Sequence, residues 1–204
     1  IYVTGFGGNT LYRNDKGRAF TDVAEKAGVK GSAWSTGCGF ADYDRDGHLD
    51  LFVSRYVRID LATLPQFGKG GGSMKGEGRG ATCMYRGVAV QCGPRGLAGE
   101  SDLLFRNDGD GHFTEVTKKA GVGDPHEYYG LGLTWFDYNA DGWPDLYVAN
   151  DSHPNFLYEN QKDGTFKEIG FPIGVAVSED GGEQGSMGIA VGDYENSGRP
   201  SIYV

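Results

Sequence analysis

Acidic residues stand at every second position in two short segments of the chain, and each segment runs into an apolar stretch. The segments read DYDRDGHLDLFV from Asp42 and DYNADGWPDLYV from Asp137. A hard divalent cation takes six to eight oxygen ligands, and alternating side chains with one backbone carbonyl supply them from a single loop. The spacing therefore predicts two calcium-binding loops.

The expected oxygen donors occupy positions 1, 3, 5, 7 and 9 of each loop, and position 7 contributes its backbone carbonyl. In the first loop they are Asp42, Asp44, Asp46, His48 and Asp50. In the second loop they are Asp137, Asn139, Asp141, Trp143 and Asp145. Each like-charged pair among the four carboxylates of the first loop costs about 0.8 kcal/mol at roughly 5 Å in water. The first loop should therefore be splayed without a cation, and the second, with one carboxylate fewer, should bind more weakly.

A helix-loop-helix calcium site also begins with alternating acids and a glycine, but it needs a bidentate glutamate at position 12 and flanking helices. Position 12 is Val53 in the first loop and Val148 in the second. Both valines lie in runs rich in aromatic and β-branched residues, which are typical of strands. We therefore expect a loop between two strands with position 9 as its last ligand. A metal-free Asp-Gly hairpin turn is the open alternative.

A third segment, DYENSGRPSIYV, keeps the same spacing from Asp193. Its possible donors are Asp193, Glu195 and Ser197, and position 9 is Ser201. With two carboxylates and no acid at position 9, this loop is predicted to bind calcium weakly or to stay empty. The chain should hold about two calcium ions, with a third weak site.

The composition indicates an all-β protein. The 204 residues include 36 Gly, 12 Tyr, 11 Phe and 3 Trp, which suits many tight turns between strands. The formal net charge of -9 argues against a nucleic-acid partner, because phosphate binding needs a basic face. No apolar stretch of about 18 residues occurs, so no membrane span is expected.

Two of the three cysteines, Cys83 and Cys92, lie in a glycine-rich region. A disulfide between them would stabilise the fold by roughly 2.5 to 3 kcal/mol and would indicate an oxidising compartment, where calcium is also abundant. Two free thiols in a cytosolic protein are the alternative. Cys38 is expected to be a small buried residue rather than a nucleophile.

Three segments align without a gap, and each reads as a strand, a tight turn and a second strand. They run from Leu11 to Val29, from Leu104 to Val122 and from Leu157 to Val175. The second strands are expected to begin at Phe20, Phe113 and Phe166, each followed by a turn of helix. The order of hairpin, connector, metal loop and strand thus recurs, with 56 positions from Asp137 to Asp193. The 95 positions from Asp42 to Asp137 indicate a glycine-rich insertion over residues 55–99.

These units resemble the FG-GAP or VCBS calcium-loop repeats of integrin-like β-propellers, as found in secreted bacterial proteins of the ASPIC/UnbV type and in proteins like the cartilage acidic proteins. The motifs that carry the resemblance are NTLYRND, ADYDRDGHLDLFV, CGPRGL, LLFRNDGDGHFTEV, FDYNADGWPDLYVAND and PNFLYENQKDGTF. The resemblance implies a propeller of about seven blades with calcium bound between strands of a blade. It also implies a secreted or cell-surface protein. The eroded third loop and the missing ASPIC/UnbV segment depart from the pattern.

The chain begins and ends at the same point of the repeat, since IYV stands at Ile1 to Val3 and again at Ile202 to Val204. We therefore expect residues 1–204 to be a partial β-propeller with three repeat units, about three blades of a longer polypeptide. An alternative in which copies join head to tail stays open.

Two functions follow from these patterns. The first is a non-enzymatic extracellular propeller with a structural, adhesion or assembly role in a matrix or filament, which binds a protein or glycan on its face and could self-assemble. The second is a calcium-stabilised lyase or hydrolase acting on polysaccharide, with His126 or His153 as general acid or base. We predict no catalytic residue and no organic cofactor, because no nucleophile elbow, phosphate loop or zinc pattern occurs. Asn150, Asp151 and Ser152 form an N-glycosylation sequon.

Overall fold

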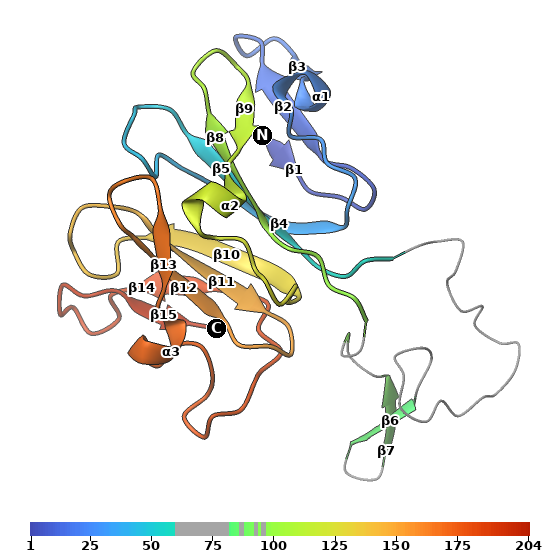
Figure 1. The fold of residues 1–204 in the computed structure, drawn as a ribbon, viewed down its shortest axis with the longest axis vertical. Coiled ribbons are helices and arrows are strands. Elements are labelled where there is room, and N and C mark those ends of the chain that lie inside the picture. The colour runs from blue at the N-terminus through green and yellow to red at the C-terminus, as the bar shows by residue number, and fades with distance from the viewer. Residues whose placement is uncertain (60–81, 86–87, 92–93, 95–96) are drawn as a thin grey trace, which may run out of the picture.

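The computed structural model describes residues 1–59, 82–85, 88–91, 94 and 97–204, and its regular structure consists mostly of antiparallel strands (Figure 1). One four-stranded sheet is formed in the order β4 (Ser35–Ala41), β5 (Asp50–Arg55), β8 (Leu103–Asn107) and β9 (Phe113–Glu115). A second is formed in the order β10 (Gly130–Phe136), β11 (Asp145–Asn150), β12 (Phe156–Asn160) and β13 (Phe166–Glu168). This confirms the predicted all-β fold, and each sheet has the strand order of a propeller blade.

Two smaller sheets flank this pair. Strands β1 (Tyr2–Val3), β2 (Thr10–Asn14) and β3 (Phe20–Asp22) form one of them, and β14 (Ala190–Gly192) pairs with β15 (Ser201–Tyr203) in the other. The repeat as read from the sequence is thus offset from the sheets, because the second and third hairpins each complete the sheet of the acidic loop that precedes them in the chain.

The three hairpins have the boundaries that the sequence predicts. Their second strands begin at Phe20, Phe113 and Phe166. A single turn of helix follows each one, as α1 (Ala24–Ala27), α2 (Thr117–Ala120) and α3 (Gly170–Ile173). Each turn ends at a glycine in the left-handed region, Gly28, Gly121 or Gly174, which an L side chain disfavours. In the part of the chain that is described, no helix is long and apolar enough to cross a membrane.

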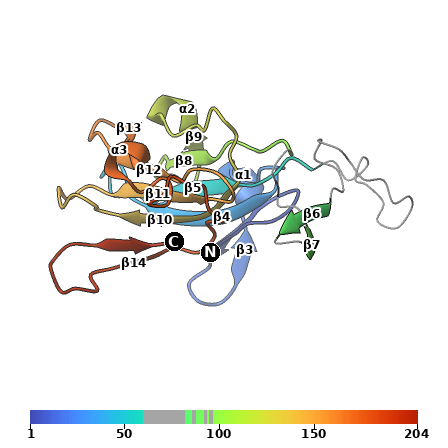
Figure 2. The ribbon, with the colours of Figure 1, turned by 90° about the horizontal axis from the view of Figure 1, so that it is seen from below.

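Strand β5 is buried on both faces, because consecutive sheets pack against each other (Figure 2). Successive residues of a strand point to opposite sides. Leu51 and Val53 accordingly join a core cluster with Tyr2 of the first sheet, whereas Phe52 joins a second cluster with Leu146 of the next one. The apolar run that follows the first metal loop therefore holds three sheets together.

Glycines let the sheets approach closely where β4 lies beside β10. A Cβ on Gly37 would lie 2.7 Å from the carbonyl oxygen of Leu131, which is too close for any side chain. The same alternation turns Cys38 to the opposite face of β4, where it is exposed. The prediction that Cys38 is buried was wrong, because the buried face of this strand is the glycine face.

The insertion leaves the fold at a β-bridge between Val57 and Gly99, on the side of the molecule away from the metal loops (Figure 1). Within it, β6 (Thr82–Tyr85) pairs with β7 (Val88–Gln91). The predicted Cys83–Cys92 disulfide requires Cys92, which lies outside the described residues.

Candidate metal sites

The three acidic loops lie along one edge of the molecule, and each joins the first two strands of its sheet (Figure 1). The first loop connects β4 to β5, the second connects β10 to β11, and the third connects β14 to β15. All flanking elements are strands, so the helix-loop-helix alternative is excluded.

The loops share one backbone conformation. Position 4 has a positive φ in all three, with values of 60° at Arg45, 58° at Ala140 and 53° at Asn196. Position 6 is a glycine with positive φ each time. Its amide donates a hydrogen bond to the position 1 carboxylate, at 3.1 Å to Asp42, 2.8 Å to Asp137 and 2.7 Å to Asp193. The conformation of the turn therefore depends on the backbone at positions 4 and 6 and on the carboxylate at position 1, and it is the same whichever side chains occupy positions 3 and 5.

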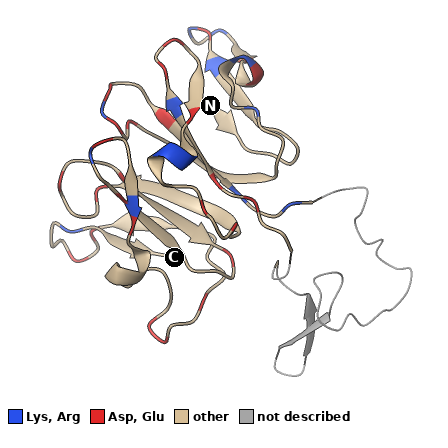
Figure 3. Cartoon of the chain, viewed as in Figure 1, with Lys and Arg blue, Asp and Glu red and all other residues tan. Residues whose placement is uncertain are grey.

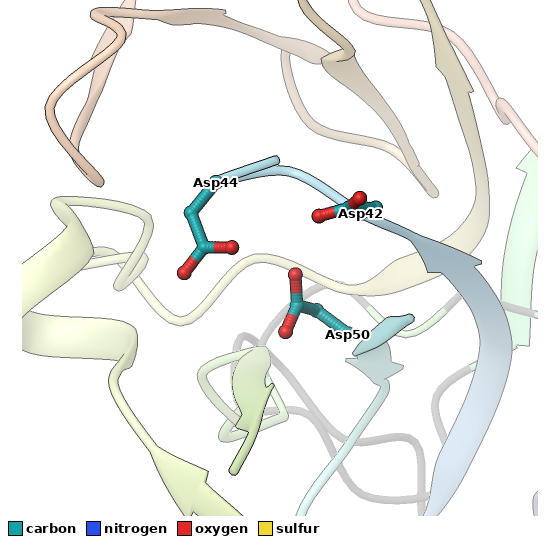
Figure 4. A group of neighbouring side chains, drawn as sticks. All are labelled: Asp42, Asp44 and Asp50. Carbon is teal, nitrogen blue, oxygen red and sulfur yellow. The ribbon is translucent and has the colours of Figure 1, made fainter. Parts of the chain in front are cut away.

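In the first loop, carboxylate oxygens of Asp42, Asp44 and Asp50 lie within 4.8 Å of one another (Figure 4). Asp50 is fully buried at the start of β5, and this burial raises its pKa to about 7. Its two oxygens accept hydrogen bonds from the amides of Tyr43 (3.1 Å) and Asn107 (2.8 Å). Burial also raises the pKa of Asp44, with a further contribution from Asp46. Three carboxylates are thus held together where water screens them poorly.

These residues fit a calcium ion. The Oδ1 atom of Asp42 is buried and has no hydrogen-bond partner within the described chain. A buried carboxylate oxygen without a partner is costly, so native proteins rarely leave one. All the side-chain donors here are hard oxygens, which calcium prefers. A cation between the three carboxylates would satisfy Asp42 and offset the mutual repulsion.

One predicted side-chain ligand of this loop, Asp46, lies outside the cluster. Asp46 is exposed, and its Oδ1 accepts a hydrogen bond from the His48 amide at 2.8 Å. The imidazole of His48 packs over the β8–β9 turn, where a Cβ on Gly109 would lie 2.7 Å from Nε2. The structure therefore brings together Asp42, Asp44 and Asp50 but not Asp46.

The second loop has the same frame with fewer charges. Asp145 is fully buried, which raises its pKa to about 6, and it accepts hydrogen bonds from the amides of Tyr138 (3.1 Å) and Asn160 (2.8 Å). Position 3 is the amide Asn139. Both oxygens of Asp137 are used by loop amides, at 3.0 Å and 2.8 Å.

Asp141 of the second loop forms an ion pair with a lysine side chain. The Lys162 ammonium lies 3.1 Å from Asp141 Oδ2, and the Asn139 amide donates to the same oxygen at 3.1 Å. The pKa of Asp141 is lowered, first by the Trp143 amide and then by Lys162. This loop thus satisfies much of its own charge.

The third loop is exposed, and its own amides form hydrogen bonds to the position 1 carboxylate. Asp193 accepts hydrogen bonds from the amides of Ser197 and Gly198, which lower its pKa. Glu195 instead accepts a bond from the hydroxyl of Tyr194 at 2.9 Å. Glu195 is thus engaged away from the position 1 carboxylate, in line with the erosion seen in the sequence.

Sequence reasoning missed two asparagines that support the loops. Asn107 and Asn160 each donate a side-chain hydrogen bond to the carbonyl before the position 9 acid, to Leu49 at 3.0 Å and to Pro144 at 3.1 Å. A signal was available, because the three aligned hairpins all carry Asn at this point, the first being Asn14.

The histidines considered for catalysis lie in an aromatic stack. His126 and His153 pack on Tyr128 with ring centroids 5.2 Å and 4.3 Å away. The asparagine of the sequon, Asn150, is 1% exposed, and its Nδ2 donates to the Pro154 carbonyl at 2.7 Å. The folded protein therefore does not offer Asn150 for glycosylation.

Comparison with known proteins places these loops in a family context. A family model described as FG-GAP-like repeat matches residues 1–53, 96–148 and 137–204. The chain is 39% identical over 83 residues to cartilage acidic protein 1 of Homo sapiens, an alignment that covers 36% of this chain and 12% of that protein. The protein of the same name from Mus musculus is 37% identical over 83 residues, again with 12% of its length covered. The chain thus spans a small part of these relatives, and it belongs to the FG-GAP-like repeat family.

Proposed function

We propose that this chain is part of a calcium-stabilised, non-catalytic β-propeller that works outside the cell and presents a face to a protein or glycan ligand. The observation that carries the proposal is the cluster of Asp42, Asp44 and Asp50, with one fully buried carboxylate and one buried oxygen that lacks a partner. Calcium would supply the positive charge that this cluster lacks.

The role of the ion follows from the position of Asp50. This residue begins β5, the strand buried between neighbouring sheets, and it also accepts the amide of Asn107 at the end of β8. Holding Asp50 against the loop therefore fixes the start of β5 and the end of β8, which pair with each other in the sheet. The chain's own groups orient the carboxylates, and the ion would hold them there.

Several features support an extracellular, non-catalytic role. Extracellular modules bind calcium at 10⁻⁴ to 10⁻³ M, so a surface loop with four carboxylates would be filled there. The relatives are named for cartilage and for acidity, and this chain has a net charge of -9. In the described part of the chain, Figure 3 shows Lys and Arg on several separate elements, with Asp and Glu among them, and the net charge of -9 agrees with a partner other than nucleic acid. The packing of His126 and His153 on Tyr128 favours a structural use of these rings over the enzyme alternative.

Thermal unfolding with calcium and with a chelator tests the structural role. Calcium at 100 times its dissociation constant should stabilise the fold by about 2.7 kcal/mol per site. Asp44→Ala should lose most of this gain, whereas Asp193→Ala, in the self-satisfied third loop, should keep it. An identical melting temperature in calcium and in chelator would contradict the proposal.

A further inference from the structure

The first and second loops touch each other. The guanidinium of Arg45, at position 4 of the first loop, lies over the ring of Trp143, at position 7 of the second, with 5.0 Å from Cζ to the ring centroid. Beneath this surface contact, the loops are also connected through one buried side chain, that of Asn160.

Asn160 is 2% exposed and uses all its polar groups. Its backbone amide donates to Asp145 of the second loop at 2.8 Å. Its side-chain Nδ2 donates to the carbonyl of Tyr43 in the first loop at 2.8 Å and to the carbonyl of Pro144 at 3.1 Å, while Oδ1 accepts the amide of Lys162 at 2.9 Å. A buried amide with every group satisfied holds a single position.

A continuous path of hydrogen bonds therefore joins the two buried carboxylates. Asp145 accepts from Asn160, Asn160 donates to Tyr43, and Tyr43 donates its own amide to Asp50 at 3.1 Å. Tyr43 is itself buried, with 3% of its surface exposed. Movement of the first loop around Asp50 must accordingly displace Tyr43 and disturb Asn160.

Asn107 provides a matched comparison within the same molecule. It stands at the equivalent place in the preceding sheet, with its amide on Asp50 at 2.8 Å and its Nδ2 on the Leu49 carbonyl at 3.0 Å. It is half-buried, and its hydrogen bonds to metal-loop residues go to the first loop. Asn160 makes the same local bonds and adds the bond to a different loop.

We propose that Asn160 is a positioning residue that couples the two calcium sites, so that calcium in the first loop raises the affinity of the second. This rests on the proposed calcium binding. Without a cation, repulsion among the carboxylates of the first loop leaves Tyr43 less ordered. Calcium in that loop fixes Tyr43 and, through Asn160, orders Asp145 before the second ion arrives, so the second ion meets a smaller ordering cost. By linkage, calcium in the second loop raises the affinity of the first by the same factor.

The test compares calcium affinity at the second loop with and without a working first loop, in the natural full-length protein. Trp143 lies in the second loop, so its fluorescence reports calcium binding at that loop. The part of the calcium-dependent fluorescence change that disappears in Trp143→Phe is assigned to the second loop. All proteins carry Arg45→Ala, which removes the contact between Arg45 and the Trp143 ring. Alanine is acceptable there because Ala140 has the same positive φ at the same position.

Asp44→Ala, which disables the first loop, should weaken calcium binding at the second loop about fivefold. In proteins that also carry Asn160→Ala, Asp44→Ala should weaken calcium binding at the second loop by less than twofold. In proteins that carry Asn107→Ala instead, Asp44→Ala should still weaken it about fivefold. Because Asn160→Ala could fail to fold, circular dichroism must show it folded. The comparison of Asp44→Ala with its parent tests the coupling without that variant.

The outcomes separate the two proposals. Absence of calcium binding at both loops overturns the proposed function. Binding at both loops with no effect of Asp44→Ala on the second overturns the coupling alone. Coupling that persists at full size in folded Asn160→Ala overturns the role of Asn160.

Discussion

The first and second loops have the same backbone and different electrostatics. Both join two strands, both use a positive φ at position 4, and both bury the position 9 carboxylate completely. The first loop nevertheless leaves Asp42 Oδ1 without a partner, whereas the second places Lys162 beside Asp141 and has an amide at position 3. The shape of such a loop is thus independent of its need for a metal, which is set by the charge that the protein leaves uncompensated.

The largest expected effect comes from the shared position 9. Asp50→Ala removes the acceptor of two buried amides, those of Tyr43 and Asn107, so we expect about 3 kcal/mol of destabilisation in urea unfolding. In chelator, Asp145→Ala should lower the free energy of unfolding by a similar amount, because Asp145 accepts equivalent hydrogen bonds from two backbone amides. In calcium the Asp50 variant should lose more than the Asp145 variant. Equal losses in calcium would show that the two loops depend on the ion alike.

Exchanging position 3 tests whether charge sets affinity. Asp44→Asn gives the first loop the residue of the second, and we expect calcium affinity to fall about tenfold, or about 1.4 kcal/mol. Asn139→Asp should raise the affinity of the second loop in turn. Isothermal titration calorimetry measures both, and a first loop that keeps its affinity as Asp44→Asn would refute the charge argument.

A pH effect distinguishes the middle repeat from its neighbours. Asp102 stands where the flanking repeats have Asn9 and Asn155, and all three accept a hydrogen bond from a backbone amide at or just beyond the end of the neighbouring strand. Burial raises the pKa of Asp102 to about 8, with Asp124 adding to the rise and Arg55 opposing it. The folded state therefore holds a proton that the unfolded state has released, so stability should fall as pH rises from roughly 4 to 8.

Asp102→Asn should flatten this dependence, because the amide still accepts the bond from Arg55 and does not ionise. Chemical denaturation at pH 5 and pH 8 in chelator measures the difference. If the unfolding free energy of the variant changed with pH as much as that of the parent, a group other than Asp102 would be responsible for the pH dependence.

The smallest expected effect concerns the lysine. Lys162→Gly should raise calcium affinity at the second loop about threefold, because Asp141 then becomes free to face the ion. The expected effect is small because an exposed ion pair contributes little free energy. Glycine occupies the aligned position in the β8–β9 hairpin, which completes the sheet of the first loop, as Gly109, and both positions have a positive φ. Gly109→Lys should weaken the first loop in return. No change in either variant would mean that Lys162 does not compete with the metal.

Local features of the chain were predictable because they depend on near neighbours. The starts of the hairpin strands at Phe20, Phe113 and Phe166 follow from turn residues that stand beside them in the sequence. The strand on each side of the metal loops follows from β-branched and aromatic runs in the same way. Such preferences act over a few residues and survive in any packing.

Features that depend on which face of an element is covered were not predictable in this way. Asp46 has the right spacing but remains exposed outside the cluster, Cys38 points away from the covered face of β4, and the sequon residue Asn150 is buried. These outcomes depend on the neighbouring sheet, and a single repeat carries no information about it.

By itself, the sequence determined the repeated hairpins, the three acidic turns and the all-β class, because turn chemistry and strand periodicity act between residues close in the chain. Only the tertiary structure decided that Lys162 reaches Asp141 and that Asn160 joins two loops. These contacts link residues far apart in sequence or on different sheets, so they exist only once the sheets have packed.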